Sequence, residues 1–95
     1  MDFLIDNGIS QNVIVEIEDN NEDSLVYNFI CNWKNVVLIL EYFKSIGIKS
    51  IDRLLIYKLE IFLIDYERIV KAFNAYDATI LAQLINEDIN AINFL

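Results

Sequence analysis

Hydrophobic residues recur at helical spacing along almost the whole chain. Val13, Ile14 and Ile17 share one face of a segment over 11–19, and Ser10 stands where the N-cap of that helix is expected. A polar, acidic run over 19–23 ends this first stripe. Residues 24–31 are apolar but short, and their periodicity is compatible with either a short helix or a buried strand. We interpret them as a short helix.

The longest stripe covers 33–46, where Val36, Leu40 and Phe43 recur on one side. Further apolar positions widen this stripe, which indicates a helix that is covered on two sides. Asn32 is placed to cap its amino end, and Gly47 is placed to end it in a left-handed conformation.

Four further helices are predicted after Gly47, and the first three have recognisable N-caps. Ser50, Asp65 and Asp77 are the expected N-caps. In the helix that follows Asp77, the positions predicted to face inward are Ile80, Leu81, Leu84 and Ile85. Asp88 interrupts that stripe and predicts a break before a last short helix, whose apolar residues are Ile89, Ile92 and Leu95. The pattern therefore predicts six or seven short helices and an all-α fold.

Two glycine-isoleucine pairs, Gly8-Ile9 and Gly47-Ile48, occur at equivalent points of this pattern. Each pair closes one apolar helical stretch and opens the next, which is typical of a duplicated supersecondary unit. We therefore expect residues 1–95 to form a single domain of short antiparallel helices. About two helical repeats would stack in it as a curved, solenoid-like array.

The second unit resembles the helical repeat of the mitochondrial transcription termination factor family. The matching residues are Tyr42-Phe43-Lys44-Ser45-Ile46-Gly47-Ile48, Ile51, Leu54-Leu55, Ile61-Phe62-Leu63, Ile69 and Phe73. The resemblance implies a repeat architecture, and it implies nucleic-acid binding because the better-known members wrap nucleic acid with a basic surface. This chain lacks the proline that the family repeat usually carries before its apolar tail, near Leu59 and Glu60.

The charge of this chain argues against the nucleic-acid binding that the resemblance implies. The 95-residue chain has a formal net charge of −8, and all seven of its bases lie between Lys34 and Lys71. An acidic field repels phosphate backbones and anionic lipid surfaces. We therefore expect neither nucleic acid nor membrane as a partner, and a nucleic-acid-associated regulator is kept as the alternative function.

The residues that usually carry chemistry are scarce. The chain has no histidine, so the commonest general base and the commonest zinc ligand are missing. Cys31, the only cysteine, lies in an apolar stretch and is predicted to be a buried structural residue. Asp19, Asn21 and Asp23 match the start of a calcium loop, but Ser24 and Ile30 replace its glycine and its glutamate. We predict a non-catalytic protein with no catalytic residue, metal site or cofactor.

Location is predicted from features that the sequence lacks. A single cysteine forms no internal disulfide, and no basic region precedes the first apolar residues. No uncharged apolar run approaches the roughly 18–20 residues that span a bilayer. A cytoplasmic protein without a membrane segment is expected.

An array of only about two repeats is expected to leave apolar surface exposed at its ends. About three stacked repeats are generally needed for stability, because each end repeat has one face that no neighbouring repeat covers. The residues expected on such a surface are Leu25, Tyr27, Phe29, Trp33, Phe94 and Leu95. The leading hypothesis is a small soluble protein-interaction module that either forms a homo-oligomer or docks onto a protein partner.

Overall fold

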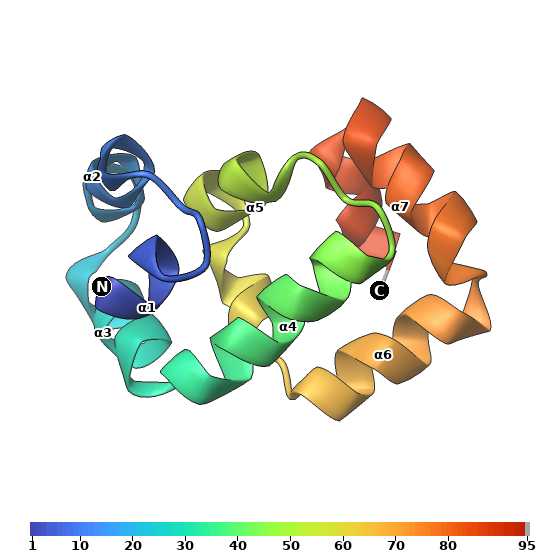
Figure 1. Cartoon of the computed structure of the whole chain (residues 1–95), viewed down its shortest axis with the longest axis horizontal. Helices are drawn as coiled ribbons and strands as arrows, with labels where there is room; N and C mark the ends of the chain where they lie inside the picture. Colours follow the sequence, from blue (N-terminus) through green and yellow to red (C-terminus); the bar gives the residue numbers. More distant parts are fainter. Residues whose placement is uncertain (95) are drawn as a thin grey trace.

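The computed structural model describes residues 1–94, and every regular element within them is helical (Figure 1). The elements are α1 (Asp2–Ile5), α2 (Gln11–Asn20), α3 (Asp23–Cys31), α4 (Trp33–Ser45), α5 (Ile51–Tyr57), η1 (Leu59–Leu63), α6 (Tyr66–Ala75), α7 (Ala78–Glu87) and η2 (Ile89–Phe94), where η denotes a 3₁₀ helix. The predicted all-α class is confirmed, and the ambiguous segment after the acidic run is a helix, α3. Leu95, one of the predicted partner residues, lies outside the described part.

Helix α4 occupies the middle of the molecule. It packs against α1, α3, η1 and α6, while α2 packs on α5, α3 on η1, and α7 on both α6 and η2. Figure 1 shows the N-terminal helices at one end of the long axis and the α6–α7 pair at the other. Coverage of α4 by elements from both halves of the chain explains its broad apolar stripe.

Aromatic rings link the two halves in the core. Phe43 of α4 lies 5.7 Å from the ring of Phe62 in η1 and 5.5 Å from the ring of Phe73 in α6. Phe29 of α3 reaches the same cluster through an edge-on contact of 6.2 Å with Phe62. All four rings are fully buried, so each contributes strongly to the burial of apolar surface.

Two glycines end their helices with the same hydrogen-bonded turn. Gly8 and Gly47 have φ angles of +86° and +90°. The N–H of Ile9 donates to the carbonyl of Leu4, and the N–H of Ile48 donates to the carbonyl of Phe43, both over 3.0 Å. This six-to-one hydrogen bond defines a Schellman ending, and the left-handed conformation predicted for Gly47 is confirmed. Before α7 the corresponding residue with positive φ is Asp77, at +68°.

All five residues predicted as N-caps occupy the N-cap positions of their helices, and two of them cap with their side chains. The Ser10 hydroxyl accepts from the N–H of Val13, and the Asp77 carboxylate accepts from the N–H groups of Thr79 and Ile80. Asn32, Ser50 and Asp65 stand at the predicted positions, but their side chains make no capping hydrogen bond. The Asn32 amide instead donates backwards to the carbonyl of Asn28.

Three asparagine side chains connect segments that are distant in sequence. The Asn21 amide donates to the carbonyl of Ile56 at the end of α5, over 3.1 Å. Asn35 binds the turn between η1 and α6. Asn86 of α7 accepts from the N–H of Lys49 over 2.7 Å and donates to the carbonyl of Gly47 over 2.9 Å. These amides satisfy backbone groups that the helices leave without partners.

Candidate interaction surfaces

The structure separates the predicted partner residues instead of gathering them. Phe29 is fully buried, so its assignment to a partner surface is wrong: the inner face of α3 packs it between Phe3 and Phe62. Leu25 is half-buried against the core. Tyr27 and Trp33 are exposed near the junction of α3 and α4. Phe94 is 71% exposed on η2, which packs on α7, far from α3 along the molecule (Figure 1).

Trp33 is held on two sides. Its ring lies 6.4 Å from the ring of Phe3, and the Lys34 ammonium lies 5.7 Å from its centre. A cation at that distance is attracted to the negative face of the indole. These contacts cover part of the indole and leave nearly half of the Trp33 side chain open to solvent.

The acid-rimmed groove, as we name it, lies between α2 and α3. It has a volume of about 320 Å³ and is lined by Glu18, Asp23, Val26, Tyr27 and Ile30. A hydrogen bond to Cys31 and the charge of that side chain raise the pKa of Tyr27 above its ordinary value of 10.0, and a phenol with the ordinary value is already neutral at physiological pH. Tyr27 therefore offers a broad neutral surface beside two carboxylates.

The base-rimmed groove runs along α6. Its volume is about 470 Å³, and its lining residues are Ile64, Arg68, Ile69, Lys71, Ala72 and Ala75. Sequence reasoning did not select this site. The available signal was the spacing of Ala72 and Ala75, whose short side chains leave room on one face of the helix between two bases.

The α7 face, defined here as Ile80 and Leu84, is exposed on two adjacent turns of the last α-helix. Ile80 is 54% and Leu84 is 46% exposed, whereas Leu81 and Ile85 are buried. The prediction that all four point inward is therefore wrong for two of them. Apolar residues surround most of α7, so periodicity could not show which side would be covered.

Cys31 is exposed, which contradicts the predicted buried cysteine. Phe29 directs the inner face of α3 toward the core, and at about 100° per residue Ile30 and Cys31 turn away from it. The apolar residues next to Cys31 in the sequence therefore do not bury its thiol in the fold.

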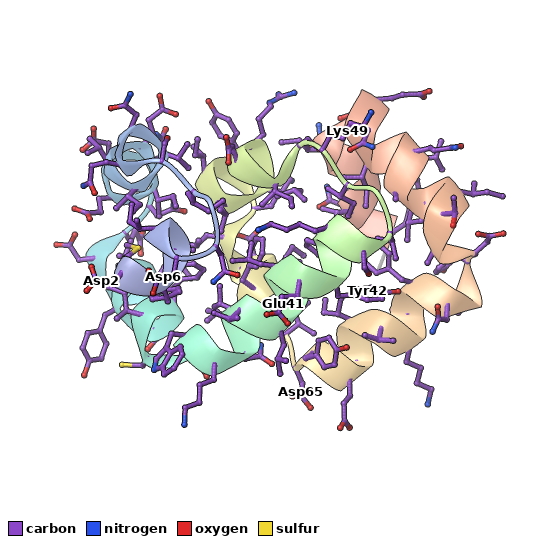
Figure 2. The ribbon with its side chains drawn as sticks, viewed as in Figure 1. Asp2, Asp6, Glu41, Tyr42, Lys49 and Asp65 are labelled. Atoms are coloured by element: carbon purple, nitrogen blue, oxygen red, sulfur yellow. The ribbon has the colours of Figure 1, made fainter. Side chains whose placement is uncertain are left out.

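The Tyr42 hydroxyl is buried and has no hydrogen-bond partner within residues 1–94, the part of the chain that the structure describes. Its ring extends from α4 toward α6, where it meets Tyr66 and Phe73 edge-on at 6.3 and 5.8 Å (Figure 2). Burial, and to a smaller extent the neighbouring Tyr66, raises the pKa of Tyr42 above its ordinary value of 10.0. This hydroxyl stays protonated where an exposed tyrosine would ionise.

The bases are distributed over several elements. Lys34 and Lys44 lie at opposite ends of α4, and the Lys44 ammonium donates to the carbonyl of Asn7. Lys58 donates to the side chain of Asn93 over 3.3 Å. Among residues 1–94, no three cysteine, aspartate or glutamate side chains group closely enough to hold a metal ion. No helix in the same range is both long and apolar enough to span a bilayer.

Comparisons with known protein families, with characterised proteins and with solved structures find no match. The chain is an all-α protein, and its candidate sites are the three apolar surfaces described above.

Proposed function

We propose that this chain is a small helical protein-interaction module without catalytic activity, and that the α7 face is its contact with a partner protein. The observation that carries the proposal is the exposure of Ile80 and Leu84 on consecutive turns. Residues four apart on a helix form one continuous ridge. A helix that leaves a ridge of large aliphatic side chains in water is a common docking element in helix-in-groove recognition.

Charge around the α7 face indicates the kind of partner. Asp77, Glu87 and Asp88 flank it, and no base follows Lys71 in the chain. A partner surface with apolar residues between lysines or arginines would complement this arrangement, whereas an acidic partner would be repelled. The proposed partner is therefore a protein with a basic-rimmed apolar groove or an amphipathic basic helix.

The repeat architecture is part of the same proposal. The identical turns at Gly8 and Gly47, and the pairing of α1 with α4, α2 with α5 and α3 with η1, support a stacked arrangement of units. Helices α6, α7 and η2 would then form a third unit, which the sequence pattern did not suggest. The outer face of this last unit would include the α7 face.

A matched pair of variants tests the proposal. The double variant Ile80→Ser and Leu84→Ser removes the α7 face, and the control Ile5→Ser and Val15→Ser removes two similarly exposed apolar residues elsewhere. A partner is captured by cross-linking to the parent in its native host, purified, and titrated against all three proteins. We expect at least about tenfold weaker binding for the α7 variant and little change for the control. Equal loss in both variants, or none in either, would contradict the proposal.

A further inference from the structure

The two grooves described above are complementary to each other. One has apolar walls and two acids, Glu18 and Asp23, and the other has apolar walls and two bases, Arg68 and Lys71. Helices α2 and α3 lie toward one end of the long axis, which measures 33 Å, whereas α6 runs from the middle of the molecule toward the other end (Figure 1). One copy therefore cannot bring its own grooves together, but two copies can.

We infer that a second copy of this chain places Tyr27 and Ile30 of its acid-rimmed groove into the base-rimmed groove along α6, so that copies join head to tail. This contact uses surfaces other than the α7 face and does not depend on the function proposed above. A contact between different patches of identical subunits leaves one patch free at each end, so further copies can add.

Shape supports this pairing. Ala72 and Ala75 are the smallest residues that line the α6 groove, and they leave space beside Ile64 and Ile69. Tyr27 and Ile30 are both exposed and one turn apart on α3, so they can enter that space together. Burial of an aromatic ring and an aliphatic side chain removes apolar surface from water on both copies.

Charge supports the same pairing and opposes the obvious alternatives. Insertion of Tyr27 brings Glu18 and Asp23 toward Arg68 and Lys71, which places acids opposite bases at the rim. A contact between two acid-rimmed grooves, or between two α7 faces flanked by Asp77 and Glu87, would place acids opposite acids. The remaining negative charges of the two copies repel at long range, but physiological salt screens charges beyond about 8 Å.

Charge reversal provides the test, because all four charged residues are exposed and contribute little to the core. Arg68→Glu with Lys71→Glu reverses one groove and changes the net charge from −8 to −12, and Glu18→Lys with Asp23→Lys reverses the other and changes it to −4. The variant that carries all four substitutions returns to −8 and restores opposite charges across the contact. Circular dichroism checks that each variant remains helical.

Sedimentation velocity over about a hundredfold range of protein concentration measures association at physiological ionic strength. We expect the average mass of the parent to rise steadily with concentration. Each two-residue reversal should lower the association constant at least about tenfold, and the four-residue variant should recover it. Tyr27→Ala should weaken association without altering the charge.

Four results would overturn the inference. They are a parent that stays monomeric, a parent that stops at a dimer, reversals that have no effect, and a four-residue variant that fails to recover. The Ile80→Ser and Leu84→Ser variant distinguishes the head-to-tail contact from the partner contact proposed for the α7 face. In sedimentation velocity this variant should self-associate as strongly as the parent.

Discussion

The side chain of Asn35 caps a helix that begins 31 residues later. Its carbonyl oxygen accepts from the N–H of Tyr66, the first residue of α6, over 2.9 Å, and its amide donates to the carbonyls of Phe62 and Ile64 over 3.2 and 2.8 Å. Three hydrogen bonds from one partly buried side chain therefore fix the turn between η1 and α6. That turn includes Ile64, which lines the α6 groove.

Replacement of this amide should destabilise the whole chain. Asn35→Ala leaves one N–H group and two carbonyls of a partly buried turn without this partner, and we expect the free energy of unfolding to fall by about 2–3 kcal/mol. Urea denaturation followed by circular dichroism measures the change. Asn32→Ala, which removes only an exposed hydrogen bond to the carbonyl of Asn28, is the matched control and should cost well under half as much. Equal effects for the two variants would show that Asn35 does not hold the turn.

The hydroxyl of Tyr42 is expected to reduce stability. Because it is shielded and has no partner among residues 1–94, Tyr42→Phe should leave stability unchanged or raise it by about 1 kcal/mol. Thermal unfolding at neutral pH measures this. A loss of more than about 1 kcal/mol would indicate that the hydroxyl makes a favourable contact.

The raised pKa of Tyr42 also predicts an alkaline dependence of stability. The folded chain retains the Tyr42 proton above pH 10.0, the ordinary value, while the unfolded chain releases it. Unfolding is therefore favoured as pH rises, so this part of the stability is present below that pH and lost as pH increases toward the folded pKa. Urea titrations at neutral and alkaline pH should show a smaller alkaline loss for Tyr42→Phe than for the parent. Tyr57→Phe, at an exposed position, is the control.

Glycine is expected to be required at position 47 because of its backbone conformation and not because a larger side chain would clash. A Cβ placed there meets nothing within 4 Å, but φ is +90°. Gly47→Ala should therefore lower the free energy of unfolding by about 1 kcal/mol through left-handed strain. Gly47→Asn should lose less, because asparagine tolerates positive φ. Calorimetry that finds alanine and asparagine equivalent would indicate that the turn relaxes to another conformation.

Cys31 should react in the folded state. Its exposure predicts complete modification by a thiol-specific disulfide reagent without denaturant, at a rate within about tenfold of that for the urea-unfolded chain. Absorbance of the released thiolate follows the reaction. Cys31→Ser should change stability by no more than about 0.5 kcal/mol. A thiol that reacts only after unfolding would place it inside the core.

Local patterns were sufficient to predict most of the helices. The spacing of Val36, Leu40 and Phe43 predicted α4, and the place of Gly47 just beyond that stripe predicted the turn that ends it. The caps were harder, because Asp65 appeared suitable from its neighbours alone while the group that caps α6 comes from α4. Long-range hydrogen bonds of this kind leave no local signature.

Surface assignment failed for a related reason. Phe29, Ile80 and Cys31 each lie in stretches that are apolar on more than one side, and the covered side depends on which other element packs there. Helix α3 turns Phe29 inward because Phe62 and Phe3 contact it, whereas no element among residues 1–94 covers Ile80 to the same extent. Side-chain periodicity gives the angle between residues, but it does not give the identity of the neighbour.

The hydrogen bonds made by Asn21, Asn35 and Asn86 come from uncharged amides. Salt therefore has little effect on their strength, and the amides do not change protonation state with pH. The head-to-tail contact that we propose between molecules combines apolar side chains with carboxylates, an ammonium and a guanidinium group, and its charged part responds to electrolyte. The turns held by these three asparagines and the charged part of that contact therefore depend on different chemical groups. A cell could alter the second through its ionic composition while the first stays constant.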